Sequence, residues 1–299
     1  MTSSRATLDP GVGLTERIVH LPDGRALRTV HGGGPGGPLV VFEAGMSAPA
    51  ASWIHTQREV SAHARTVSYD RAGYGGSDLD PQPRTLERIV EDLAAMLNLI
   101  DEPGPAIFVG HSWGGPILRV LAERHPERVA GLVFVDATVA ESMSERTAKL
   151  AAVSFMVLSL VARAGGTGLV KKVTVPHGFS PDISEQDVTI MHRDYACARA
   201  MQAGRREAQQ ILSALPVMAR LQAAGTPDVP TVCIQAGRID RGTAHLRPRM
   251  NAAAERLMAA APQGRVVVVE KAGHRVPQEC PEAVYAPIVD VIKAVGASA

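Results

Sequence analysis

The stretch Ile107-Phe-Val-Gly-His-Ser-Trp-Gly-Gly115 decides how this chain folds. Its first residues form an apolar strand pattern, and a helix-forming stretch at 117–123 follows its glycines at once. This order predicts a tight strand-to-helix turn that holds Ser112 clear of the backbone, with the glycines at 110 and 114 permitting close approach of neighbouring segments. A serine hydroxyl presented in this way is a candidate nucleophile.

A serine nucleophile needs a base to take its proton and a carboxylate to orient that base. The apolar strand pattern at 265–270 runs into a loop that carries His274, which we predict to be the base. The strand pattern at 230–236 runs into a loop that carries Asp240, which we predict to be the orienting acid. We expect His111, beside the serine, to point the other way on the turn and to pack behind the site.

A second carboxylate competes for the role of the acid. Asp136 follows the apolar strand pattern at 129–135 just as Asp240 follows its own strand. A carboxylate at that place would equally serve as a polar cap of the next segment. The Gly-x-x-Asp spacing at 237–240 favours Asp240, and Asp136 stays the alternative acid.

The order Ser, Asp, His, with each residue just beyond a strand, resembles the α/β-hydrolase superfamily from about residue 15 to the C-terminus. The stretch Val40-Val-Phe-Glu-Ala-Gly-Met-Ser47 is similar to the family's strand and oxyanion loop. The stretch Tyr69-Asp-Arg-Ala-Gly-Tyr-Gly-Gly-Ser-Asp78 is similar to its Gly-rich turn. By this resemblance, the backbone N–H groups of Met46 and Trp113 would form the oxyanion hole.

Strand patterns alternate with helical patterns along most of the chain. We expect strands near 16–20, 25–30, 38–43, 65–69, 105–110, 129–135, 230–236 and 265–270, and helices near 52–62, 84–100, 114–125, 247–261 and 281–295. Strands this apolar, separated by helices, indicate a mostly parallel sheet covered on both faces, with the first hairpin as an antiparallel edge. The expected fold class is α/β, an eight-stranded α/β-hydrolase fold.

Two glycine-rich runs admit other interpretations. The run at 31–37 has the His-Gly-Gly-Gly sequence of some lipase oxyanion loops, but its strongly apolar strand follows it, so we interpret it as a hairpin connection. The run at 73–76 lacks the Gly-Lys-Ser/Thr ending of a phosphate-binding loop. We expect Asp70 to tie this second turn together with Arg71.

The alternation of strands and helices breaks between residues 141 and 225, where the composition is helical. This segment is the expected cap over the active site, inserted into a core formed by residues 1–140 and 226–299. Its most apolar part, at 150–162, has 13 residues, too few to cross a bilayer, which takes about 20. That part would line an apolar pocket, pack as an ordinary helix or form an interface.

The composition is that of a soluble enzyme without a nucleic acid partner. The 299 residues are 45% hydrophobic and 20% charged, with a formal net charge of +1, so a large core can form and nothing attracts a polyanion. Three cysteines at 197, 233 and 280 give no metal-ligand spacing and imply no disulfide framework. The first residues lack the apolar centre of a secretory signal, so we expect a cytoplasmic protein. The sequence leaves undecided whether the chain forms a homodimer.

The arrangement predicts acyl transfer to water through a covalent intermediate, with no metal or organic cofactor. The expected substrate is a small to medium apolar ester or lactone. A serine at 112 argues against haloalkane dehalogenases and epoxide hydrolases, because those resembling families use an aspartate there.

Other activities on the same three residues stay open. They are those of an aminopeptidase or amidase, a carbon–carbon bond hydrolase and an acyltransferase, because cap side chains and water access distinguish them. Acidic residues in the segment 182–194 would suit the recognition of an amino group by a peptidase. A ligand receptor that retains the triad is the non-enzymatic alternative.

Overall fold

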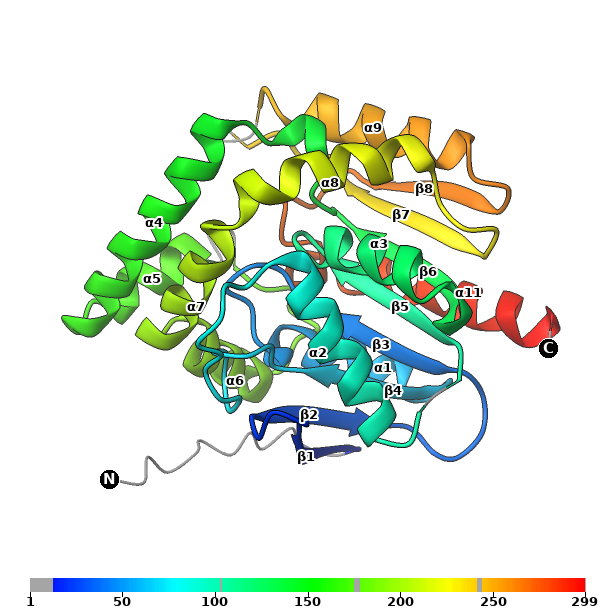
Figure 1. The fold of residues 1–299 in the computed structure, drawn as a ribbon, viewed down its shortest axis with the longest axis horizontal. Coiled ribbons are helices and arrows are strands. Elements are labelled where there is room, and N and C mark those ends of the chain that lie inside the picture. The colour runs from blue at the N-terminus through cyan, green and yellow to red at the C-terminus, as the bar shows by residue number, and fades with distance from the viewer. Residues whose placement is uncertain (1–12, 103, 175–177, 241–243, 299) are drawn as a thin grey trace.

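The computed structural model describes residues 13–102, 104–174, 178–240 and 244–298 (Figure 1). Eight strands form one sheet in the order β1-β2-β4-β3-β5-β6-β7-β8. The strands are β1 (Leu14–His20), β2 (Ala26–Gly32), β3 (Leu39–Glu43), β4 (Arg65–Tyr69), β5 (Ala106–His111), β6 (Val129–Val135), β7 (Thr231–Ala236) and β8 (Gly264–Val269). β2 runs antiparallel to β1 and β4, and all other neighbours are parallel. The expected eight-stranded, mostly parallel sheet is confirmed.

Helices cover both faces of this sheet, which explains why its central strands are apolar on both sides. One face packs against α2 (Leu86–Leu99), α3 (Gly114–Arg124) and α9 (Arg247–Ala259). The other face packs against α1 (Ile54–Val60) and α11 (Glu282–Ser298), as Figure 1 shows. The short elements η1 (Ala50–Trp53), η2 (Pro126–Arg128) and α10 (Val276–Glu279) complete the core. Every residue of β3 and β5 is buried, so the loops at their ends have a rigid base.

The glycine-rich run at 31–37 is not a hairpin connection, contrary to our prediction. β2 pairs with β4 rather than with β3, so the run leads from β2 past β4 to the far side of that strand. Gly33 adopts a φ of +82°, and a Cβ there would stand 2.1 Å from the carbonyl oxygen of Ala64. The run therefore needs glycine where it passes the segment before β4.

Asp70 stabilises the turn after β4, but its ionic partner is Arg28 rather than Arg71. Arg28 Nε lies 2.5 Å from Asp70 Oδ2, and both side chains are fully buried. Asp70 also accepts hydrogen bonds from the backbone N–H groups of Ala50 (2.8 Å) and Gly76 (3.1 Å). The role that we predicted for Asp70 in the turn is correct, and its predicted partner is wrong.

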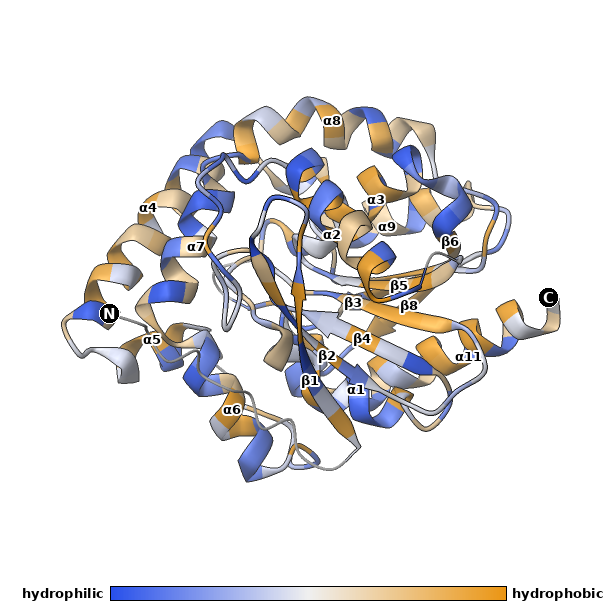
Figure 2. Cartoon of the chain, turned by 60° about the horizontal axis from the view of Figure 1, so that its bottom comes forward, coloured by the Kyte–Doolittle hydropathy of each residue, from blue (hydrophilic) through white to orange (hydrophobic). Residues whose placement is uncertain are grey.

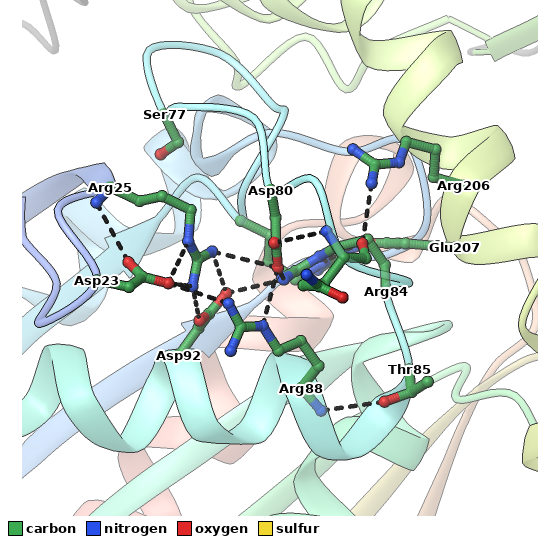
Figure 3. A network of polar contacts seen from close by, with 12 residues as sticks. Asp23, Arg25, Ser77, Asp80, Arg84, Thr85, Arg88, Asp92, Arg206 and Glu207 are labelled. Carbon is green, nitrogen blue, oxygen red and sulfur yellow. Dashed lines mark hydrogen bonds and ion pairs between the residues drawn. The ribbon is translucent and has the colours of Figure 1, made fainter.

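A buried ion cluster fastens the β1–β2 hairpin to α2 and to the segment before it (Figure 3). Arg25 Nη2 lies 2.5 Å from Asp92 Oδ1, and Arg84 Nη1 lies 2.9 Å from Asp92 Oδ2 and 2.6 Å from Asp80 Oδ2. Asp92 is 4% exposed. Because each buried charge faces an opposite one, removing one member would leave its partners uncompensated.

We therefore expect Asp92→Ala to lower the free energy of unfolding by about 3 kcal/mol, the cost of leaving buried arginines without their carboxylate. Urea unfolding at pH 7 measures the change. The neighbouring Glu91 is the matched control, because its side chain is 59% exposed and lies 3.7 Å from Arg124. Equal losses in Asp92→Ala and Glu91→Ala would contradict the importance of the buried cluster.

The segment between β6 and β7 contains helices and no strand among its described residues. The helices are η3 (Ala140–Ser142), α4 (Glu145–Arg163), α5 (Thr167–Thr174), α6 (Glu185–Tyr195), α7 (Ala198–Ala208) and α8 (Ile211–Ala224). α4 lies at one edge of the molecule and carries hydrophobic residues along most of its length (Figure 2). Phe155 and Leu158 pack against the core, whereas Leu150, Val153, Val157 and Leu160 are 48–58% exposed. None of the described helices is long and apolar enough to span a bilayer.

Candidate active site

Ser112 stands on a strained turn between β5 and α3. Its φ is +53°, a left-handed conformation that non-glycine residues rarely adopt. The flanking glycines make room for this turn: a Cβ on Gly110 would stand 2.8 Å from the Leu118 side chain, and one on Gly114 would stand 2.5 Å from the Glu43 carbonyl oxygen. The Gly-x-Ser-x-Gly spacing is therefore a steric requirement, and the serine is held at the carboxyl edge of the sheet.

His274 connects Ser112 to a buried carboxylate. Its Nε2 lies 3.0 Å from Ser112 Oγ, and its Nδ1 lies 2.6 Å from Asp136 Oδ2. His274 follows β8, and Asp136 follows β6, so each side chain extends from the loop beyond a parallel strand. The three side chains form one continuous line of hydrogen bonds in the order expected for proton transfer from the serine.

The prediction that Asp240 orients His274 is corrected by this geometry. An imidazole ring has two nitrogens, and Ser112 and Asp136 occupy both of them. Asp240 instead binds Arg238, whose Nε lies 2.9 Å from Asp240 Oδ1. β6 lies directly between β5 and β7 in the sheet, so the end of β6 is nearer to the serine turn than the end of β7. The alternative acid, Asp136, is the residue that the structure places beside the histidine.

Asp136 is fully buried and surrounded by hydrogen-bond donors. Arg247 Nη2 donates to its Oδ2 (2.9 Å), Arg247 Nη1 donates to Oδ1, and the backbone N–H of Ala236 donates to Oδ1 (3.1 Å). Burial alone would raise the pKa of Asp136, but His274 and Arg247 outweigh it and hold that pKa well below its usual value. The carboxylate is therefore ionised at neutral pH. No spacing in the sequence pointed to Arg247.

His111 packs behind the histidine, as predicted. Its ring centroid lies 4.9 Å from that of His274, and its Nε2 donates to the His274 carbonyl oxygen at 2.8 Å. Burial, and then the charges of His274 and Arg275, lower the pKa of His111 to about 3. The ring is therefore neutral at working pH, and it supports the loop that carries His274.

The neutral His111 makes stability depend on pH. In the unfolded chain it takes up a proton below its usual pKa of 6.5, whereas the folded chain does so only near a pKa of about 3. Its contribution to stability is thus present above pH 6.5 and lost as the pH falls. We expect a loss of about 2 kcal/mol between neutral pH and pH 5, at about 1.4 kcal/mol per pH unit.

Urea unfolding of the wild type and His111→Gln at both pH values measures this loss. The glutamine amide can still donate to the His274 carbonyl, so the variant should lose less stability on acidification. Equal losses in the two proteins would contradict the assignment of a buried neutral ring to His111.

The two predicted oxyanion donors belong to segments that adjoin the serine. Met46 follows Gly45, and a Cβ on Gly45 would stand 3.2 Å from the Cβ of Ser112, so the loop after β3 touches the serine turn. Trp113 directly precedes the first residue of α3. Among the residues that the structure describes, neither backbone N–H donates to another group. Both donors are therefore available to an oxygen atom of a ligand.

Arg71 holds the loop that carries Met46, a role that the sequence did not indicate. Its guanidinium is buried and binds the carboxylates of Glu43 (2.5 Å) and Glu207 (2.8 Å). It also donates to the carbonyl oxygens of Ala44 (2.7 Å) and Gly45 (2.9 Å). Glu207 belongs to α7, so this one arginine ties the loop after β3 to the helical segment.

The profile of the alpha/beta hydrolase family matches residues 29–286. Epoxide hydrolase A of Mycobacterium tuberculosis is 34% identical over 126 residues, which are 40% of this chain and 37% of that protein. The protein YqjL of Bacillus subtilis is 30% identical over 122 residues, 41% of this chain and 48% of that protein. The chain thus spans less than half the length of these relatives.

Solved structures are similar over nearly the whole chain. The enol-lactonase from Burkholderia xenovorans has a TM-score of 0.70 at 21% identity, covering 93% of this chain and 100% of that one. The epoxide hydrolase VrEH1 from Vigna radiata has a TM-score of 0.77 at 20% identity, covering 94% and 98%. A thermophilic esterase from Thermogutta terrifontis has a TM-score of 0.72 at 22% identity, covering 94% and 99%. At these identities the similarity establishes the fold.

Proposed function

The chain belongs to the alpha/beta hydrolase family, and on that premise we propose that it is a serine hydrolase that cleaves an apolar carboxylic ester or lactone of small to medium size. The observation that carries the proposal is the line of hydrogen bonds from Ser112 through His274 to Asp136. An esterase and an enol-lactonase are among the solved structures with this fold.

The proposed reaction begins when His274 Nε2 takes the proton of Ser112 as Oγ attacks the substrate carbonyl. The resulting oxyanion accepts hydrogen bonds from the N–H groups of Met46 and Trp113. Each such donor lowers the activation free energy by about 3 kcal/mol, because the negative charge on the oxygen develops near the transition state. Asp136 holds the Nδ1–H tautomer and stabilises the imidazolium. His274 then protonates the leaving alcohol and activates the water that releases the acid.

The elbow residue favours this chemistry over that of the epoxide hydrolases among the relatives. Ser112 carries a hydroxyl at the position where the epoxide hydrolase and dehalogenase families, which this chain resembles, carry a carboxylate. Without a carboxylate at 112, the alkyl-enzyme ester on which their reaction depends cannot form there. A serine with a base at 3.0 Å suits attack on a carbonyl carbon instead.

Two acidic residues of α6, Asp187 and Asp194, give little support to the aminopeptidase alternative. The Asp187 carboxylate binds Arg58 at 2.7 Å, and the Asp194 carboxylate binds Arg28 at 2.6 Å. Both carboxylates are buried in these ion pairs. A substrate ammonium group would have to compete with an arginine at each position.

We also propose that residues 141–225 act as a cap over the site. Gly204 of α7 lies against the loop that carries Met46, since a Cβ there would stand 2.7 Å from the Cβ of Ser47. Tyr195 at the end of α6 binds the side chain of Arg275, the residue after His274. Helices of the segment thus contact both loops, and Phe155 of α4, packed beside Gly204, adds an apolar surface. These contacts support the assignment of the segment as a cap over the site.

Hydrolysis of p-nitrophenyl esters of increasing acyl length, together with a series of lactones, tests the proposal. We expect multiple turnovers and an optimum chain length set by the cap. Ligand-induced thermal stabilisation without steady-state product release would favour a receptor. Cleavage of anilides, or of a carbon–carbon bond, with no reaction on any ester would shift the assignment to the corresponding alternative.

A further inference from the structure

Two side chains and one backbone N–H share the carboxylate of Asp136. Its Oδ2 lies 2.6 Å from His274 Nδ1 and 2.9 Å from Arg247 Nη2, and its Oδ1 accepts from Arg247 Nη1 and the Ala236 N–H. Arg247 is 2% exposed, so solvent barely screens this bidentate pair. Part of the negative charge that would stabilise an imidazolium ion is thus already offset by an arginine.

The other charged groups around His274 nearly balance one another. Arg275 follows it in the chain, and its guanidinium lies 5.0 Å from the Tyr195 ring. Beside the preceding Gly273 lies a cluster in which Arg238 binds Asp240 (2.9 Å) and Glu279 (2.7 Å). The formal charges of Asp136, Arg247, Arg275, Arg238, Asp240 and Glu279 cancel. His111, which packs on His274, is neutral, so these groups together carry a net negative charge when Arg247 is lost.

We infer that Arg247 sets the lowest pH at which the reaction proceeds. By offsetting the charge of Asp136, it keeps His274 unprotonated, and therefore able to act as a base, at a lower pH than an unpaired Asp136 would allow. Arg247 touches no reacting atom and acts only through Asp136, so it is a positioning residue. The inference rests on the proposed function, because it assigns the pH range of that same site. A purely structural ion pair would leave the pH range unchanged.

The test measures the rate of covalent labelling of Ser112 by diisopropyl fluorophosphate between about pH 4 and pH 9, because labelling requires the base but no natural substrate. We expect the midpoint of the acidic limb to rise by about one pH unit in Arg247→Gln, which removes the charge but retains amide donors. Arg247→Lys retains the charge and should keep the wild-type midpoint. Arg249→Gln is the matched control, since Arg249 is exposed on the same helix.

Three results would overturn the inference. They are an unmoved midpoint in Arg247→Gln, an equal shift in Arg249→Gln and a shifted midpoint in Arg247→Lys. If Arg247→Gln fails to unfold cooperatively on heating, a shifted midpoint in Arg247→Lys, which retains the buried charge, still overturns the inference.

A wild type that is not labelled at any pH would instead overturn the proposed serine hydrolase. In that case, the His274 ring resonances followed by NMR across the same pH range still test Arg247. We expect the titration of this ring to move upward in pH in Arg247→Gln and to stay at the wild-type position in Arg249→Gln.

Discussion

Ser112→Ala is expected to reduce kcat/KM for the best p-nitrophenyl ester by about 10⁶-fold, the loss typical of a serine nucleophile. The variant has no oxygen at 3.0 Å from His274 Nε2, so no covalent intermediate can form. The proposed donors at Met46 and Trp113 would still stabilise an oxyanion, and they should leave a small residual rate over the uncatalysed reaction. The loss should appear in kcat, because the substitution leaves the side chains that would bind the substrate unchanged.

Labelling stoichiometry separates loss of the nucleophile from loss of folding. We expect one diisopropyl phosphoryl group per wild-type chain and none on Ser112→Ala, with similar thermal unfolding of the two proteins. Ser154→Ala, at an exposed position on α4, should label and turn over like the wild type. Labelling of Ser112→Ala, or more than about a tenth of the wild-type rate, would contradict the assignment of the nucleophile.

The strands of the core could be predicted because their burial dictates their composition. β5, with the sequence AIFVGH, is buried at every residue, and the predicted range 105–110 differs from the observed Ala106–His111 by one residue. The order of the strands in the sheet could not be predicted in the same way. The path from β2 past β4 to β3 depends on pairing between distant segments, and local sequence around residues 31–37 does not encode it.

The site was predictable where local backbone geometry determines it. The glycines at 110 and 114, which close neighbouring segments require, are visible in the sequence, and they led us to predict Ser112 as the nucleophile. The choice between two carboxylates was not local, because both Asp136 and Asp240 follow apolar strands. It depends on which strand lies beside β5, and β6 does. Arg238, two residues before Asp240, was a sequence signal that this carboxylate has another partner.

The exchange of Asp136 for asparagine is therefore the sharpest test of the site's geometry. We expect Asp136→Asn to reduce kcat by about 10⁴-fold, because an amide that donates to Nδ1 forces the proton onto Nε2, which then cannot accept the serine proton. Asp240→Asn should change kcat less than about twofold, since a partly exposed ion pair away from His274 contributes little. Its partner Arg238 and the Asp240 side chain are 30% and 29% exposed.

One competing explanation for a slow Asp136→Asn enzyme is loss of structure. Asparagine leaves Arg247 buried without its countercharge, which costs about 3–5 kcal/mol and could unfold part of the population. The wrong-tautomer explanation predicts a folded protein whose Ser112 is labelled slowly and to full stoichiometry, whereas partial unfolding predicts fast labelling of a reduced fraction. Time courses of labelling at pH 7 distinguish the two. If Asp240→Asn were instead the slow variant and Asp136→Asn labelled at the wild-type rate, the acid would be Asp240, and the hydrogen bond at 2.6 Å from His274 Nδ1 would not be the one that the reaction uses.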